Sequence, residues 1–164
     1  MKSNTKKIVL AAMLAALLTV ATIVVVIPLP FKGYINLGDC IVLLSGWILS
    51  PAYAFFAAAI GASLADVISG YIVYAPATFI IKGTMAICAG ALSKGLRKKT
   101  GEAASYILSA AIAELIMIAG YYVFEGFLYG FIASAVNIPA NAVQAAFGAV
   151  ISLILIKLLK RTKV

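Results

Sequence analysis

Long apolar runs separated by short polar segments dominate the chain, and they predict helices that cross a membrane. Residues 8–27 are almost wholly apolar, and twenty helical residues span a hydrocarbon core of about 30 Å. We expect every segment to be helical, because an open sheet edge cannot face lipid. The second segment is too short for a full upright span. The six predicted segments are residues 8–27, 39–50, 52–71, 76–92, 103–124 and 134–159, the last interrupted by Pro139.

The basic residues cluster beside the apolar runs and indicate the orientation of the chain. Six crossings place both termini on one side, and eleven of the thirteen Lys and Arg residues fall on that side. Because basic loops stay in the cytoplasm, we predict that both termini are cytoplasmic. The segment "PLPFKGYINLGD", residues 28–39, is then outside. The cytoplasmic residues are Lys2, Lys6, Lys7, Lys94, Arg97, Lys98, Lys99, Lys157, Lys160, Arg161 and Lys163, and the outer ones are Lys32 and Lys82.

Composition predicts a single membrane domain over residues 1–164 and excludes several function classes. Charged residues make up 11% of the chain, whereas a soluble domain carries about a quarter. The net charge of +8 lies in short clusters that flank the spans, so we expect no binding of nucleic acid. The chain has no His, two Cys and no P-loop motif, so we expect no enzyme activity, no metal and no cofactor of its own.

Several polar residues near the outer ends of the spans are candidates for substrate binding, because polar groups in a bilayer are costly. Asp66 and Lys82 are expected at similar depth on neighbouring helices, where they form a structural ion pair or reach the substrate. Asp39 follows Gly38 at the start of an apolar helix, and we interpret it as an N-cap. Tyr34 and Asn36 have no such local role. From this group we select Tyr34, Asn36 and Lys82 as substrate-binding candidates.

Two further helices each carry a polar face. Glu114, Tyr121 and Glu125 are spaced so that they share one face of the fifth helix, which should point inward. Amide side chains on the last helix lie at spacings of four and three residues, and they are either glue between helices or a hydrogen-bonding wall for a polar ligand. We select the second interpretation. The candidates from these helices are Glu114, Tyr121, Asn137, Asn141 and Gln144.

Aromatic residues are concentrated at the predicted outer end, which holds 11 of the 17. An interfacial belt should appear at both faces of the membrane, so an aromatic-lined pocket is a second explanation for this excess. The only Trp, Trp47, falls near the cytoplasmic end, at the wrong depth to stack on a ligand. The outer aromatic residues are Phe31, Tyr34, Tyr71, Tyr74, Phe79, Tyr121, Tyr122, Phe124, Phe127, Tyr129 and Phe131.

Small residues four apart on the first helix form a smooth stripe that lets another helix come close. The stripe serves either internal packing or the docking of a separate membrane protein. It consists of Ala11, Ala12, Ala15 and Ala16.

The motifs together resemble a known family over nearly the whole chain. "GYINLGD", "GASLADVISGYIVYAPATFIIKG" and "NIPANAVQAAFG", with the Ala stripe, are similar to S components of energy-coupling factor (ECF) vitamin transporters. The group that they resemble is the riboflavin-type S components, which includes hydroxymethylpyrimidine and pyridoxine carriers. The resemblance implies six helices, cytoplasmic ends, and an outer pocket with residues 28–39 as lid and wall.

The same resemblance implies partners and a function. The partners would be a transmembrane T component, docked on the Ala stripe, and two ATPase subunits that use ATP. The chain would bind a water-soluble vitamin or precursor at the prokaryotic plasma membrane, with pyridoxine, hydroxymethylpyrimidine and riboflavin left open. The alternative is a stand-alone secondary transporter that couples to protons through Glu114.

Overall fold

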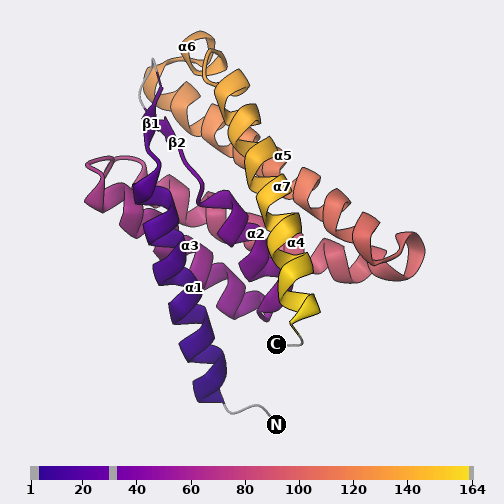
Figure 1. Cartoon of the computed structure of the whole chain (residues 1–164). Coiled ribbons are helices and arrows are strands. Elements are labelled where there is room, and N and C mark those ends of the chain that lie inside the picture. The colour runs from indigo at the N-terminus through magenta and orange to yellow at the C-terminus, as the bar shows by residue number, and fades with distance from the viewer. Residues whose placement is uncertain (1–3, 30–32, 163–164) are drawn as a thin grey trace.

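The structure is a computed structural model that describes residues 4–29 and 33–162. These residues form seven helices and two short strands (Figure 1). Lys2, Pro30, Phe31, Lys32 and Lys163, which contributed to the predictions, lie outside the described residues. The elements are α1 (Asn4–Val24), β1 (Ile27–Pro28), β2 (Tyr34–Ile35), α2 (Asp39–Ile48), α3 (Pro51–Ile68), α4 (Ala75–Thr100), α5 (Glu102–Tyr129), α6 (Phe131–Ala135) and α7 (Ile138–Arg161).

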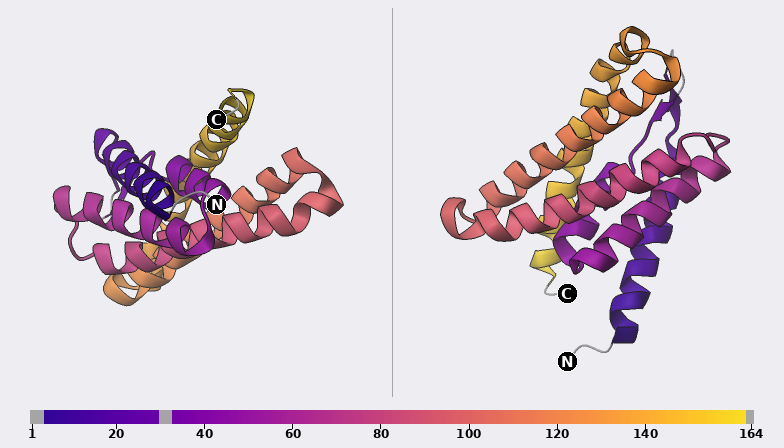
Figure 2. Two further views of the ribbon diagram at one scale, coloured as in Figure 1. Left: turned by 90° about the horizontal axis from the view of Figure 1, so that it is seen from below. Right: turned by 180° about the vertical axis from the view of Figure 1, so that it is seen from behind.

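The prediction of an all-α membrane protein is confirmed. In the described residues, five stretches of helix are long and apolar enough to cross a membrane: α1, α3, α4, α5, and α6 together with α7. Helix α2 has ten residues and is too short to cross alone. The described chain begins and ends at the same end of the molecule, while β1, β2 and α6 lie at the opposite end (Figures 1 and 2). The cytoplasmic orientation of the termini stays a prediction.

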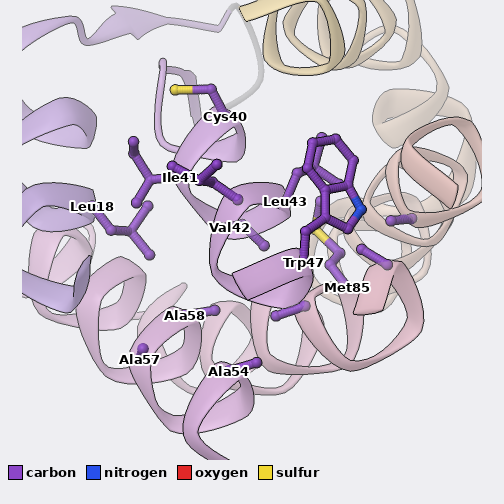
Figure 3. Close-up of a cluster of buried hydrophobic side chains, with 14 of the residues drawn as sticks. Leu18, Cys40, Ile41, Val42, Leu43, Trp47, Ala54, Ala57, Ala58 and Met85 are labelled. Atoms are coloured by element: carbon purple, nitrogen blue, oxygen red, sulfur yellow. The ribbon is translucent and has the colours of Figure 1, made fainter. Parts of the chain in front are cut away.

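Helix α2 forms the centre of the fold. Nine of its ten residues are buried, from Asp39 to Trp47, because the helix is apolar on all sides and is enclosed by α1, α3, α4 and α7. Val42 and Leu43 on this helix and Met85 on α4 are fully buried in the hydrophobic core around it (Figure 3). Trp47 belongs to this core as well, and its indole nitrogen donates to Ser109 Oγ at 3.0 Å.

Several predicted boundaries were wrong, each for a physical reason. The polar stretch 93–102 is not a loop, because α4 continues through its Lys, Arg and Leu residues, which favour helix, and ends at Gly101. The stretch 125–130 is not a break either: α5 runs to Tyr129 and ends at Gly130, whose φ of 92° suits glycine. Pro139 does not interrupt a helix. It lies in the first turn of α7, where a missing N–H costs nothing.

A small β-hairpin, which the sequence did not predict, forms in the connection between the first two predicted helical segments. Helix α1 ends at Val24 rather than at Ile27, and Ile27 pairs with Ile35 and Pro28 with Tyr34 in antiparallel register. The two strands follow the apolar run of α1 and are only two residues long. Unlike a sheet that spans the membrane, they need not expose open edges to the hydrocarbon core. The hairpin places residues 33–38 over the end of the helix bundle where α2 begins.

Helices α2 and α4 come into direct backbone contact through glycine. A Cβ atom built on Gly46 would collide with the carbonyl oxygen of Ala86, and one built on Gly90 would collide with the carbonyl oxygen of Gly46. Small residues at a crossing allow this close approach between membrane helices. The contact fixes the distance between α2 and α4, and with it the position of polar residues on both helices.

We therefore expect opposite effects from two alanine substitutions on α4. Gly90→Ala should destabilise the protein by about 1–3 kcal/mol, because the added methyl group meets backbone that cannot yield. Gly95→Ala is the matched control: a Cβ atom at this position would have nothing within 4 Å, so the substitution should stabilise by about 0.5–1 kcal/mol. Thermal unfolding in detergent measures both. Equal melting temperatures for the two variants would contradict the close contact.

Candidate functional site

A cluster of buried polar side chains lies at the end of the molecule that holds the hairpin. Residues 33–38, α2, α3, α4, α5 and α7 all contribute to it. Four of its members are carboxylates and one is a lysine. We call this set the polar cluster: Tyr34, Asn36, Asp39, Asp66, Tyr74, Thr78, Lys82, Glu114, Tyr121, Glu125, Asn137, Asn141 and Gln144.

An ion pair between α2 and α4 lies at the base of the polar cluster. Lys82 Nζ donates to Asp39 Oδ1, and both side chains are buried, at 3% and 0% exposure. Gln144 Nε2 on α7 donates to Asp39 Oδ2 at 2.5 Å, and Gln144 Oε1 accepts the backbone N–H of Asn36 at 2.8 Å. These contacts join α2, α4, α7 and the segment after the hairpin.

This arrangement corrects two predictions from the sequence. Asp39 is not a helix cap, because the cap position of α2 is Gly38 and no side chain caps it. Lys82 does not pair with Asp66, because Asp39 reaches it from the central helix. The sequence placed Asp66 and Lys82 correctly on adjacent helices, but it contained no information on where α2 would lie.

Asp66 faces the hairpin instead of Lys82. Its Oδ1 accepts the Tyr34 hydroxyl at 2.6 Å, and its Oδ2 has no hydrogen-bond partner among the described residues. Beside it, the hydroxyls of Thr78 and Tyr121 lie 3.0 Å apart and share a hydrogen bond. Tyr34 therefore links the hairpin to α3 on the side of the polar cluster next to the hairpin.

Glu125 is the second carboxylate of the polar cluster that lies near the hairpin. Tyr74 donates its hydroxyl to Glu125 Oε1 at 3.2 Å, and Asn137 Nδ2 donates to Oε2 at 2.9 Å. The backbone of Gly33 lies close by, since a Cβ at that position would be 3.1 Å from Glu125 Oε1. Glu125 thus connects α5, the start of α4, the turn before α7 and the hairpin.

Glu114 lies deeper, away from the hairpin. It is 3% exposed, and neither of its oxygens has a hydrogen-bond partner among the described residues. A Cβ atom at Gly148 would be 2.9 Å from Glu114 Oε1 and 2.8 Å from Asp39 Cβ, so these three residues are packed together. The predicted inward face of α5 is confirmed for Glu114 and Glu125, which are both buried.

Two small cavities lie within the polar cluster. The first has a volume of about 20 Å³ and the second about 10 Å³, so each holds about one water molecule. Tyr34, Asn36, Asp66, Thr78 and Tyr121 line both of them. The first cavity is also lined by Leu29, Gly33, Tyr74, Glu125, Asn141 and Gln144, and the second by Leu18, Thr22, Gly38, Ala62 and Lys82.

Most of the candidates selected from the sequence come together here. Tyr34, Asn36, Tyr121, Asn141 and Gln144 line the first cavity, and Lys82 lines the second. The two exceptions do not line either cavity: Asn137 holds Glu125, and Glu114 lies beneath Asp39.

The sequence selection omitted five residues of the polar cluster that the structure brings to it, among them Thr78, an uncharged residue that the sequence did not single out. Asp39 was assigned to capping, Asp66 to pairing with Lys82, and Glu125 was noted only as part of the face of Glu114. Tyr74 was one of many outer aromatic residues. A usable signal was present in each acidic residue, because a carboxylate beside an apolar run needs a partner or a function.

Seven of the outer aromatic residues fall into two groups. Tyr34, Tyr71, Tyr74 and Tyr121 form a chain of ring contacts with centroids 4.5 to 6.5 Å apart around the polar cluster. Phe127, Phe131 and Tyr129 are exposed, as a membrane belt would be. Both explanations offered for the aromatic excess therefore have residues that fit them.

A separate apolar groove lies on the surface between α1 and α3, with a volume of about 430 Å³. All four residues of the Ala stripe line it, and Ala12 and Ala16 are exposed. Ala15 also packs internally, since a Cβ at Gly61 would be 2.6 Å from the Ala15 carbonyl oxygen. The stripe therefore combines internal packing with an open surface. The other residues of the groove are Ile8, Thr19, Tyr53, Phe56, Ala57, Ile60, Gly61 and Leu64.

Known proteins share both this sequence pattern and this fold. The chain is similar to an uncharacterized protein in gap 3'region from Pyrococcus woesei, with 35% identity over 134 residues that cover 81% of this chain and 87% of the relative. It shares its fold with the solved S component of a bacterial ECF transporter, with a TM-score of 0.78, 22% identity and 98% of each chain covered.

A protein family matches this chain over nearly its whole length. The model of the family "ECF-type riboflavin transporter, S component" matches residues 2–161, which include every helix described above. The chain therefore belongs to the S component family of ECF-type transporters, as a multi-pass membrane subunit that binds substrate.

Proposed function

We propose that this chain captures a small water-soluble vitamin or vitamin precursor from outside the cell, for uptake driven by ATP that partner subunits use. Pyridoxine, hydroxymethylpyrimidine and riboflavin are the substrates to test. The observation that carries the proposal is the polar cluster, at the end of the molecule opposite the termini, with tyrosine rings, amides and carboxylates around a shared cavity. A polar ring with hydroxyl groups needs such partners.

Binding requires the segment 33–38 to give way, because a cavity of about 20 Å³ cannot hold a vitamin. In the described residues, two hydrogen bonds hold this segment on α3 and α7: the Tyr34 hydroxyl donates to Asp66, and the Asn36 backbone N–H donates to Gln144. Each contributes a net stability of about 0.5–1.5 kcal/mol, or somewhat more for the bond to a carboxylate. A ligand bound at micromolar to nanomolar Kd supplies about 8–12 kcal/mol, so it can displace both.

The residues of the polar cluster have different proposed roles. Tyr34, Asn36, Tyr121, Asn141 and Gln144 contact the ligand from the first cavity. Lys82 holds Asp39 and reaches the ligand from the second cavity. Asn137 and Glu114 were selected from the sequence as ligand contacts. We propose instead that they do not touch the ligand: Asn137 positions Glu125, and Glu114 packs beside Asp39.

A second candidate function remains, a stand-alone transporter coupled to protons. Glu114 favours it, as a buried carboxylate without a hydrogen-bond partner in the described chain. The two candidates differ in what the chain does alone. A proton-coupled transporter moves its substrate in vesicles without partners and loses this activity in Glu114→Gln. A binding subunit without its partners binds the substrate but does not transport it.

Asn141→Ala should weaken binding without weakening the fold. The Asn141 side chain lines the first cavity, and no hydrogen bond of that side chain is found in the described residues. The loss of one ligand contact should raise Kd by about tenfold. Thermal stabilisation of the purified protein by a panel of B vitamins and precursors first identifies the ligand, because a ligand that binds only the folded state raises the melting temperature. Titration of that ligand then gives Kd.

Gln144→Ala serves as the contrast in the same experiment. It removes bonds to Asp39 and to the Asn36 backbone, so it should lower the melting temperature even without ligand. No stabilisation of a cooperatively melting wild type by any panel member would contradict the proposed function. Unchanged affinity in Asn141→Ala would remove that residue from the site.

Ala16→Phe tests whether the groove between α1 and α3 receives the T component. Ala16 is exposed in the groove, so a ring there should block assembly with co-expressed T component and ATPase subunits and leave vitamin binding unchanged. Met13→Phe is the control, because Met13 is 63% exposed on the same helix and does not line the groove. Co-purification measures assembly. Normal assembly of Ala16→Phe would place the interface elsewhere.

A further inference from the structure

Carboxylates are rare in this chain, and almost all of them are in one place. The chain has five Asp and Glu residues against thirteen Lys and Arg. Asp39, Asp66, Glu114 and Glu125 all lie in the polar cluster, at 0 to 4% exposure. The fifth, Glu102, is exposed at the start of α5, where it pairs with Arg97 and Lys160. A basic protein has therefore concentrated its negative charge inside the proposed site.

The positive charge within the polar cluster does not balance these four carboxylates. Lys82 is the one basic residue in the cluster as described, and its ammonium group is bound to Asp39. Among the described residues, the hydrogen bonds to Asp66 and Glu125 come from neutral donors, two tyrosine hydroxyls and an amide. Buried charges without a counter-ion are costly, so these two carboxylates require a positive partner or a proton.

Asp66 has an acceptor atom that the described part of the chain leaves open. Its Oδ2 is buried and has no hydrogen-bond partner among the described residues, although Asp66 is only 4% exposed and lines both cavities. Glu125 lines the first of these cavities as well. Asp66 and Glu125, which have no lysine partner among the described residues, therefore border the same space, and Asp66 has an unoccupied acceptor atom there.

The aromatic wall of this space has the same electrostatic preference. Tyr34, Tyr74 and Tyr121 line the first cavity, and the ring of Tyr71 lies against Tyr34 with centroids 4.5 Å apart. The face of an aromatic ring is negative and attracts cations. Lys82 Nζ already lies 5.4 Å from the centroid of the Tyr121 ring.

We propose that the ligand of this site carries a cationic nitrogen, which binds against Asp66 and Glu125 and the neighbouring tyrosine rings. This inference rests on the proposed function and narrows its substrate class. A charged N–H group would supply Asp66 Oδ2 with the donor that it lacks among the described residues. A hydrogen bond between two charged groups is stronger than one between neutral groups, so the same contact selects for charge.

The first test compares ligands that differ in charge, on the intact protein in detergent. Pyridoxamine and pyridoxine form a matched pair, because an ammonium group in one replaces a hydroxyl in the other. Thiamine adds a permanent cation, riboflavin a neutral ring and pantothenate an anion. We expect the tightest ligand to be a cation, and pyridoxamine to bind at least about tenfold more tightly than pyridoxine.

Each outcome of this comparison has a definite meaning. If riboflavin or pantothenate is the tightest ligand, or pyridoxine equals pyridoxamine, the proposed function stands and the charge inference is wrong. If no compound binds, the proposed function fails, and the inference with it.

The second test removes single charges from the protein. Asp66→Asn and Glu125→Gln keep the shape of each side chain, and each should weaken the cationic ligand by about tenfold to a hundredfold. Glu102→Gln is the matched control, with the same loss of charge at an exposed carboxylate outside the site, and it should leave Kd unchanged. Melting temperatures without ligand show whether each variant is folded. Equal affinity of all three variants for the cation would overturn the proposal.

Discussion

The rest of the structure depends on the ion pair between Asp39 and Lys82. It lies where the central helix α2 begins, and it joins this helix to α4 and, through Gln144, to α7. Removing two charges from water costs several kcal/mol for each, so the pair persists only because its geometry and the added amide bond offset that cost. The close contact between Gly46 and Gly90 brings the two helices near enough for the pair to form.

Helix α1 takes part in both surfaces that the proposed function needs. Leu18 and Thr22 line the second cavity of the polar cluster, while Ala15, Ala16 and Thr19 line the apolar groove toward α3. Thr19 also fastens the two helices, because its hydroxyl donates to the Gly61 carbonyl oxygen at 2.8 Å. Helix α1 thus lies between the proposed ligand site and the surface proposed for the T component. A shift of α1 would therefore change the shape of both.

Apolar length and polar spacing predicted most of the helices and most of the candidate residues. The amides of α7 and the acidic face of α5 were predictable because residues three, four, seven or eleven apart share a helical face, whatever the partner is. Helix ends were less predictable, since α4 extends through a basic stretch to Thr100 and Pro139 opens a helix instead of breaking one. Propensity at such ends is a weak signal that the surroundings override.

The pairing of charges was the part that the sequence could not determine. Two aspartates compete for one lysine, and Asp66 is close to Lys82 by helix adjacency whereas Asp39 becomes close only through the packing of α2. The hairpin was missed for a related reason: its strands have two residues each, which is too short for any alternating pattern. Both features depend on contacts between distant segments.

A double-mutant cycle on Asp39 and Lys82, followed by unfolding in detergent, tests the central claim most directly. We predict that Lys82→Met costs about 3–5 kcal/mol, because it leaves a buried aspartate without its counter-ion. Adding Asp39→Asn should restore most of that loss and leave the double variant more stable than Lys82→Met alone. Additive losses from the two substitutions would contradict the claim that this pair holds α2, α4 and α7 together.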